Sequence, residues 1–169
     1  PMHHREPGAM IAVMTDDRVT AGLIPDGIHS HPGTVRLALA AKGVDRIVIV
    51  SDMMQACGRG PGTYGIGGQA VTVDETSARL KDGTLAGSIL TMDQAMRNLV
   101  DWTDVTIPQA LHMATAVPAR LLGDPSRGNL VTGARADLTL WSNDLEVMAT
   151  YVGGVQVAEN ANGSEDSDA

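Results

Sequence analysis

The sequence predicts an α/β protein in which parallel strands precede a small all-β segment. Residues 21–29 ("AGLIPDGIH") and 46–52 ("RIVIVSD") are apolar stretches that end in polar groups. The second stretch does not alternate between polar and apolar residues, which is typical of a strand buried on both faces of a parallel sheet. From residue 128 onward, short apolar runs separated by turn glycines predict strands without a long helix.

A helix is predicted between the two apolar strands. Pro32 suits the first helical position, Lys42 suits the last turn, and Gly43 suits the position just past the end. Three residues give this helix one apolar face: Val35, Ala38 and Leu39. A strand, a helix and a second apolar strand form the βαβ pattern of a parallel sheet.

The composition of the chain changes after the second predicted strand. Residues 56–68 ("ACGRGPGTYGIGG") are dense in glycine, which predicts a loop; its part 58–68 is either a mobile loop over a pocket or a long connector. It lacks the Gly-Lys-Ser/Thr of a P-loop and the dinucleotide-binding fingerprint. Residues 69–87 alternate weakly around "KDG", which predicts a small hairpin.

Two helices with clear start signals follow. Thr91 with Gln94 and Thr106 with Gln109 have the spacing of capping boxes. Apolar residues follow each pair at helical spacing: Met92, Ala95, Met96, Leu99 and Val100 in the first helix, and Ala110, Leu111 and Ala114 in the second.

Composition limits the class of protein. The 169 residues suit one domain or one and a piece, and the net charge of −8 argues against binding to a nucleic-acid backbone. No run reaches the roughly 18 apolar residues that span a membrane. The first residues given lack the basic-then-apolar pattern of an export signal, so we do not expect export. The single Cys57 fits a reducing cytoplasm. Residues 158–169 are acidic and without periodicity, which predicts a disordered tail.

Polar residues at the ends of the two predicted strands are the candidates for chemistry. Catalytic groups of α/β sheets and barrels lie at the C-terminal ends of strands, where Asp52 and His29 both fall. The pattern alone leaves Asp52 equally compatible with a turn residue and a catalytic group. Two polar groups at the same edge of adjacent strands favour a functional role for His29.

Seven segments resemble, in this order, the N-acetylglucosamine-6-phosphate deacetylase family of the metal-dependent amidohydrolase superfamily. They are "HHREPG", "LIPDGIHSHP", "RIVIVSDMM", "DGTLAGS", "MRNLVD", "ALHMATAVPARLLG" and "RGNLVTGARADLTLWSNDLEV". The resemblance covers about residues 1–157. It implies the C-terminal part of a (β/α)₈ TIM-type barrel plus part of a small β-sandwich domain. Residues 1–123 would hold the last two barrel strands and following helices, residues 124–157 the sandwich segment, and residues 158–169 the tail.

The resemblance also implies a reaction. N-Acetylglucosamine 6-phosphate would be hydrolysed to glucosamine 6-phosphate and acetate by a metal-activated water. Asp52, at the end of the eighth barrel strand, would take a proton from that water and later give it to the departing amine. The family's metal ligands, a glutamate and two histidines, lie on earlier strands and are expected upstream of Pro1.

Substrate contacts are implied by the same motifs. His29 would contact the substrate near the reacting centre, and Asp26 and Gly27 would shape that loop. Arg5 is suited to bidentate recognition of the sugar phosphate, in relatives often across the interface of a homodimer. A sugar-lining role is implied for three consecutive residues: Ala86, Gly87 and Ser88.

We therefore expect a divalent metal, zinc or iron, in a full-length parent protein, and none in this chain alone. The chain alone is expected to be inactive as a deacetylase, because a barrel of this type needs roughly 200 residues or more to close. Two other functions stay open. The first is an amidohydrolase with another substrate, and the second is a non-catalytic half that completes a separate N-terminal chain.

Overall fold

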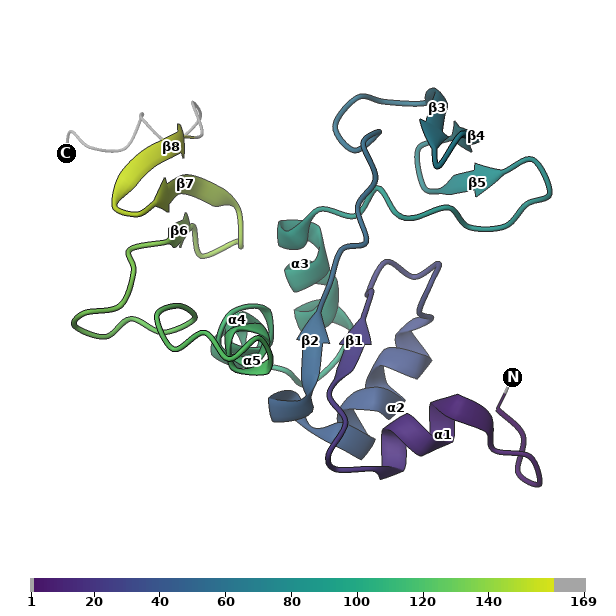
Figure 1. The fold of residues 1–169 in the computed structure, drawn as a ribbon, viewed down its shortest axis with the longest axis horizontal. Coiled ribbons are helices and arrows are strands. Elements are labelled where there is room, and N and C mark those ends of the chain that lie inside the picture. Colours follow the sequence, from purple (N-terminus) through teal and green to yellow (C-terminus); the bar gives the residue numbers. More distant parts are fainter. Residues whose placement is uncertain (1, 160–169) are drawn as a thin grey trace. The chain divides into compact units, whose positions relative to one another are not determined.

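The computed structural model describes residues 2–159. The chain divides into two compact units, Pro1–Ala114 and Thr115–Ala169, which are described separately below (Figure 1). This division assigns helix α5 (Ala116–Leu121) to the same unit as the C-terminal strands. The domain boundary between residues 123 and 124 stays a prediction.

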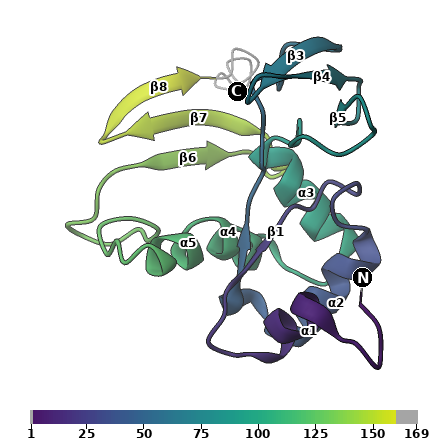
Figure 2. The same cartoon turned by 45° about the vertical axis from the view of Figure 1, so that its right-hand side comes forward.

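The first unit contains the predicted βαβ arrangement (Figure 2). Strands β1 (Ala21–Leu23) and β2 (Ile47–Ile49) are parallel neighbours, and helix α2 (Pro32–Lys42) connects them through the short 3₁₀ helix η1 (Val44–Arg46). Pro32 is the first helical residue, as predicted, and Gly43 follows the helix with a φ of 67°. The parallel pairing and the bounds of α2 confirm the sequence prediction for this region.

Helices complete the core around these strands. Helix α3 (Met92–Trp102) packs against α2, and helix α4 (Ile107–Ala114) packs against β2 and α3. The large fully buried side chains of this core are Pro25, Val35, Ile47, Met96, Leu99 and Met113. The predicted helices are confirmed, but only the second has a capping-box hydrogen bond, in which the Thr106 backbone N–H donates to Gln109 Oε1 (2.9 Å).

Helix α1 (Gly8–Thr15) was not predicted. Its sequence, "GAMIAVMT", is apolar on every side and therefore lacks the periodicity by which an amphipathic helix is recognised. The helix packs against α2. The carbonyl oxygen of Asp16, the residue that follows α1, accepts a hydrogen bond from Nζ of the buried Lys42 at the end of α2 (2.6 Å). This bond satisfies a cation that would otherwise be costly to bury.

The loop predicted over residues 56–68 is wrong for 62–66. Strand β3 (Gly62–Ile66) pairs antiparallel with β4 (Gln69–Val73), which pairs with β5 (Ala78–Leu80). Gly67 and Gly68, with φ of 55° and 81°, form the two-residue connection of a primed hairpin turn. Gly67 and Gly68 thus form a hairpin turn, whereas the earlier glycines of this stretch lie in a loop or within β3. The hairpin predicted around "KDG" is limited to one bridge, between Arg79 and Leu85.

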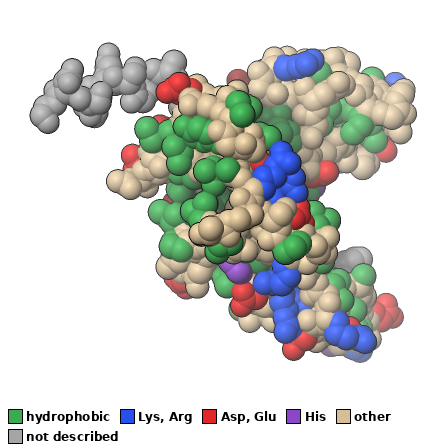
Figure 3. Space-filling model, turned by 60° about the vertical axis from the view of Figure 1, so that its left-hand side comes forward, with side chains coloured by type: hydrophobic (Ala, Val, Ile, Leu, Met, Phe, Trp, Pro, Cys, Tyr) green, Lys and Arg blue, Asp and Glu red, His purple; other side chains and the backbone are tan. Residues whose placement is uncertain are grey.

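The second unit is an antiparallel sheet preceded by α5. Its strands β6 (Leu138–Trp141), β7 (Val147–Val152) and β8 (Val155–Glu159) lie in that order, which confirms the predicted all-β segment. Large apolar side chains of this unit are exposed (Figure 3), including Leu122, Leu130 and Val155. Residues 158 and 159 of the predicted tail belong to β8, and residues 160–169 lie outside the described part.

Asp137, in the last of the seven segments that resemble the deacetylase family, has a structural role in this unit. The carboxylate of Asp137 accepts hydrogen bonds from Arg127 Nε, Arg135 Nε and the backbone N–H of Gly153, each at 2.8 Å. These donors hold the pKa of Asp137 at about 2, the Arg135 hydrogen bond contributing most. One carboxylate therefore joins the segment before β6 to the turn between β7 and β8.

Candidate functional site at two strand ends

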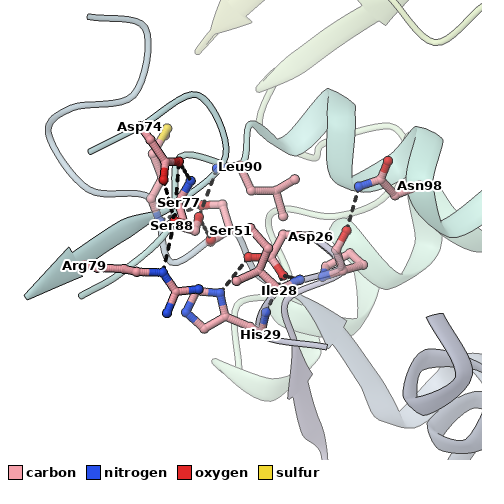
Figure 4. A network of polar contacts seen from close by, with 12 residues as sticks. Asp26, Ile28, His29, Ser51, Asp74, Ser77, Arg79, Ser88, Leu90 and Asn98 are labelled. Carbon is pink, nitrogen blue, oxygen red and sulfur yellow. Dashed lines mark hydrogen bonds and ion pairs between the residues drawn. The ribbon is translucent and has the colours of Figure 1, made fainter. Parts of the chain in front are cut away.

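The loop after β1 is organised by Asp26. Its Oδ1 accepts the backbone N–H groups of Ile28 (2.9 Å) and His29 (2.7 Å), and its Oδ2 lies 2.6 Å from His29 Nδ1 (Figure 4). The two side chains are 9% and 19% exposed. Because an ionised carboxylate can only accept, Nδ1 carries a proton in this contact. Nε2 is therefore the nitrogen of His29 that is left for a ligand.

Helix α3 supports the same loop from the side. Asn98 donates from Nδ2 to the carbonyl oxygen of Pro25 (2.8 Å). Gly27 has a φ of 79°, and a Cβ added there would lie 3.6 Å from the ring of Trp102. Glycine suits this position because the left-handed backbone region favours it. The loop is thus supported by contacts with α3 as well as by Asp26.

Opposing effects act on the pKa of Asp26. Burial by itself raises the pKa, but the hydrogen bonds from His29 and from the two backbone N–H groups outweigh it and leave the pKa below its ordinary value. Hydrogen bonds to the charged form have this effect because protonation would break them. Asp26 is therefore an ionised partner for His29.

The end of β2 places Asp52 in an unusual backbone conformation. Its φ is 49°, one of only two positive values among the non-glycine residues 2–159. The residue is exposed, and no hydrogen bond or ion pair joins its carboxylate to a described residue. A free carboxylate next to a strand end can act as a proton acceptor and donor toward a bound molecule.

Gly87 and Ser88 lie directly beside Asp52, although they are far from it in the sequence. Ala86 instead donates its backbone N–H to the carbonyl oxygen of Ala78 (2.9 Å). The backbone N–H of Ser88 donates to the carbonyl oxygen of Asp52 (2.8 Å), and the N–H of Met54 donates to the carbonyl oxygen of Ser88 (2.9 Å). Ser88 Oγ donates to the carbonyl oxygen of Ser51 and accepts the N–H of Leu90 (3.0 Å). The predicted sugar-lining segment and the predicted proton-transfer residue are thus joined through the backbone. Figure 4 shows the contacts of Ser88 with Ser51 and Leu90.

Arg5 is not joined to either loop. It is exposed in the turn bridged by His3 and Glu6, and its guanidinium makes no hydrogen bond or ion pair with any residue in 2–159. Its predicted role in phosphate recognition stays a prediction. His112, to which the sequence assigns no function, contacts Asp45 through Nε2 (2.8 Å).

Two contributors were missed at the level of sequence. Asn98 and Ser51 support the two loops, but each contacts a residue far away along the chain, 73 and 37 positions respectively. Asn98 occupies a polar position of a helix and Ser51 follows a strand, so no local pattern marks either residue. Their roles depend on which segments fold side by side.

The described residues do not by themselves fit a metal centre. No group of three or more His, Cys, Asp or Glu side chains that could hold a metal ion occurs between residues 2 and 159. Within the candidate site, Asp26 and His29 are engaged with each other.

Among residues 2–159, none of the helices has the length and apolar character needed to span a membrane.

Comparison with known sequences finds one family repeatedly. Residues 87–158 match the amidohydrolase family. The N-acetylglucosamine-6-phosphate deacetylase of Bacillus subtilis is 41% identical over 155 residues, which cover 91% of this chain and 39% of that protein. A putative N-acetylgalactosamine-6-phosphate deacetylase of Escherichia coli K12 is 41% identical over 154 residues, 90% of this chain and 92% of that relative.

Solved structures agree. The N-acetylglucosamine-6-phosphate deacetylase of Thermotoga maritima superposes with a TM-score of 0.90 at 37% identity, over 95% of this chain and 44% of that one. A mutant of the Mycobacterium smegmatis enzyme, in complex with N-acetyl-D-glucosamine-6-phosphate, superposes with a TM-score of 0.87 at 35% identity, over 92% and 42%. The chain spans about two fifths of the length of the Bacillus subtilis relative.

Proposed function

The chain belongs to the N-acetylglucosamine-6-phosphate deacetylase family of amidohydrolases, and from that membership we propose that it carries part of a site for deacetylating a phosphorylated amino sugar. The observation that carries the proposal is the pair of adjacent parallel strands whose ends present Asp52 and the Asp26–His29 pair. In this proposal β1 and β2 are the last two strands of a (β/α)₈ barrel. The strands β6–β8 are a share of its β-sandwich.

Asp52 is the proton-transfer group in this proposal. An amide is a poor electrophile and its amine a poor leaving group, so hydrolysis needs a base that activates water and an acid that protonates nitrogen. A single carboxylate can do both in sequence. The exposed carboxylate of Asp52, without an internal partner among residues 2–159, is available for both steps.

The neighbouring groups bind and orient the substrate. His29 presents Nε2 at the adjacent strand end and donates Nδ1–H to Asp26, which fixes the orientation of the ring. Gly87 lies beside Asp52, and Ala86 and Gly87 would line the sugar. Arg5 would bind the phosphate, because a guanidinium makes charge-assisted hydrogen bonds to phosphate oxygens.

A metal would have to be held by residues other than those described, since no ligand set occurs among them. This leads to a specific version of the proposal: the chain completes a second segment that supplies those ligands. The match to 39% of the Bacillus subtilis relative supports this version. The match to 92% of the Escherichia coli K12 relative supports a counterpart of similar length and brings the galactosamine epimer into consideration.

A complementation assay tests the proposal. The purified chain is mixed with the part of the Bacillus subtilis relative that it does not match, in zinc or ferrous buffer, and acetate release is measured. We expect activity on N-acetylglucosamine 6-phosphate or its 4-epimer in the mixture only. The Asp52→Asn variant should lose it, and Arg5→Ala should weaken binding of the phosphorylated sugar far more than of the unphosphorylated sugar. Full activity with Asp52→Asn would refute the assigned chemistry.

A further inference from the structure

The backbone of Asp52 is held in a conformation that costs free energy. Left-handed φ values disfavour residues with a Cβ, and aspartate tolerates them best when its own side chain makes a local hydrogen bond. The carboxylate of Asp52 makes no such bond with a residue in 2–159. Surrounding residues must therefore impose the φ of 49°.

Ser88 is the residue that contacts this turn on both sides. Its backbone N–H binds the carbonyl of Asp52, its carbonyl binds the N–H of Met54, and its hydroxyl donates to the carbonyl of Ser51. The same hydroxyl accepts the N–H of Leu90, so it is also anchored to the segment that follows it. With 3% of its surface exposed, Ser88 is one of the few buried polar residues of the described chain.

Gly87 permits this close approach. Its φ is 94°, and a Cβ at this position would lie 3.2 Å from the carbonyl oxygen of Asp52 and 3.5 Å from Cβ of Met54. A contact of 3.2 Å is tighter than almost all real Cβ contacts. Ser88 therefore reaches the turn only because the residue before it has no side chain.

We propose that Ser88 is a positioning residue that holds Asp52 in its left-handed conformation and so directs the exposed carboxylate. The assignment rests on the proposed function for the importance of Asp52, but its geometry is independent of that function. It also changes the role of Ser88, because the hydroxyl proton is already donated to Ser51 and is not available to a sugar.

A purely structural role is the competing explanation. The hydroxyl would then only satisfy two buried backbone groups, and its removal would lower stability without changing Asp52. Ser77 provides the matched control, since it is similarly buried, at 5% exposed, and its hydroxyl contacts Asp74 and Arg79 rather than the Asp52 turn.

The test is NMR of the complete chain carrying Ser88→Ala or Ser77→Ala. A positive φ gives a strong intraresidue N–H to Hα Overhauser effect, which we expect at Asp52 in the native chain and in Ser77→Ala but not in Ser88→Ala. Hydrogen exchange at the amides of Met54 and Ser88 should accelerate about tenfold in Ser88→Ala, because the bonds that protect them open. The amide of Leu80, bonded to Thr84, should be unchanged.

Retention of the positive φ in Ser88→Ala would overturn the proposal, even if that variant unfolds more easily. Should Ser88→Ala not fold, Ser88→Cys replaces the hydroxyl by a much weaker donor, so we expect a weaker Overhauser effect at Asp52 and faster exchange at Met54. No change in either would overturn the proposal. Loss of the positive φ with unchanged acetate release in the complementation assay would support the positioning role. That outcome would at the same time refute the chemistry assigned to Asp52.

Discussion

The two strand-end loops of the candidate site are held by different means. The loop after β1 is organised within itself, because Asp26 binds residues two and three positions further along. The turn after β2 is held from a distance by Ser88, whose hydroxyl partner Ser51 is 37 positions away. A charged group organises the first loop, and neutral groups hold the second. The difference shows that two neighbouring loops at strand ends can depend on unrelated parts of the chain.

The largest effect is expected at Gly87, which tests the distant support. Gly87→Ala should lower the free energy of unfolding by about 3 kcal/mol, because a β-carbon is strained at this φ and would also press against the carbonyl oxygen of Asp52 at 3.2 Å. Urea unfolding measures the loss. Gly83→Ala is the control: its φ is 86°, but nothing lies within 4 Å of the added Cβ. It should cost only about 1 kcal/mol. Equal losses would show that the approach to Asp52 is unimportant.

The next effect concerns the local support. Asp26→Ala removes a carboxylate that accepts two backbone N–H groups and the His29 ring, and it should cost about 2 kcal/mol. Urea unfolding again provides the measurement. Asp82→Ala, which removes a carboxylate bound to one exposed backbone N–H of Thr84, should cost less. If the two variants lost equal stability, Asp26 would be an ordinary turn residue.

The sequence predicted those parts of this arrangement that depend on neighbouring residues. Pro32 and Gly43 mark the ends of α2 because local backbone preferences set them. Strand β3 was missed because glycine is rare inside strands, and here the pairing with β4 and the Gly67–Gly68 turn outweigh that preference. The contact of Ser88 with Ser51 has no local signal, since only folding brings residues 37 positions apart together.

The two loops should respond differently to a fall in pH. The pKa of Asp26 is lowered on folding, so its contribution to stability is present above the unfolded value of about 3.9 and is lost as the pH falls through the lower folded value. Asp26→Asn cannot titrate. At pH 6 the free energy of unfolding of the native chain should exceed that of Asp26→Asn by about 1 kcal/mol. Urea unfolding should show this difference shrinking toward pH 3.

A difference that stays constant between pH 6 and pH 3 would mean that the charge of Asp26 does not matter. The Ser88 contacts consist of backbone groups and a hydroxyl. Amide exchange at Met54, referred to the intrinsic rate at each pH, should therefore change less with acid than exchange at Ile28. A larger acid-induced change at Met54 than at Ile28 would contradict the distinction between a charged support for the first loop and a neutral support for the second.

The smallest effect tests how far the loop after β1 depends on support from helix α3. Asn98→Ala removes two neutral hydrogen bonds, the one from Nδ2 to the carbonyl oxygen of Pro25 and an exposed one that Oδ1 accepts from Gln94, and should lower the free energy of unfolding by about 0.5 kcal/mol in urea unfolding. Gln94→Ala is the control, because Gln94 binds the Oδ1 of Asn98 and not the loop. The amide of His29 should exchange faster in Asn98→Ala than in Gln94→Ala. A loss larger than that of Asp26→Ala would reverse the comparison, since the loop after β1 would then be held chiefly by α3, 73 positions away.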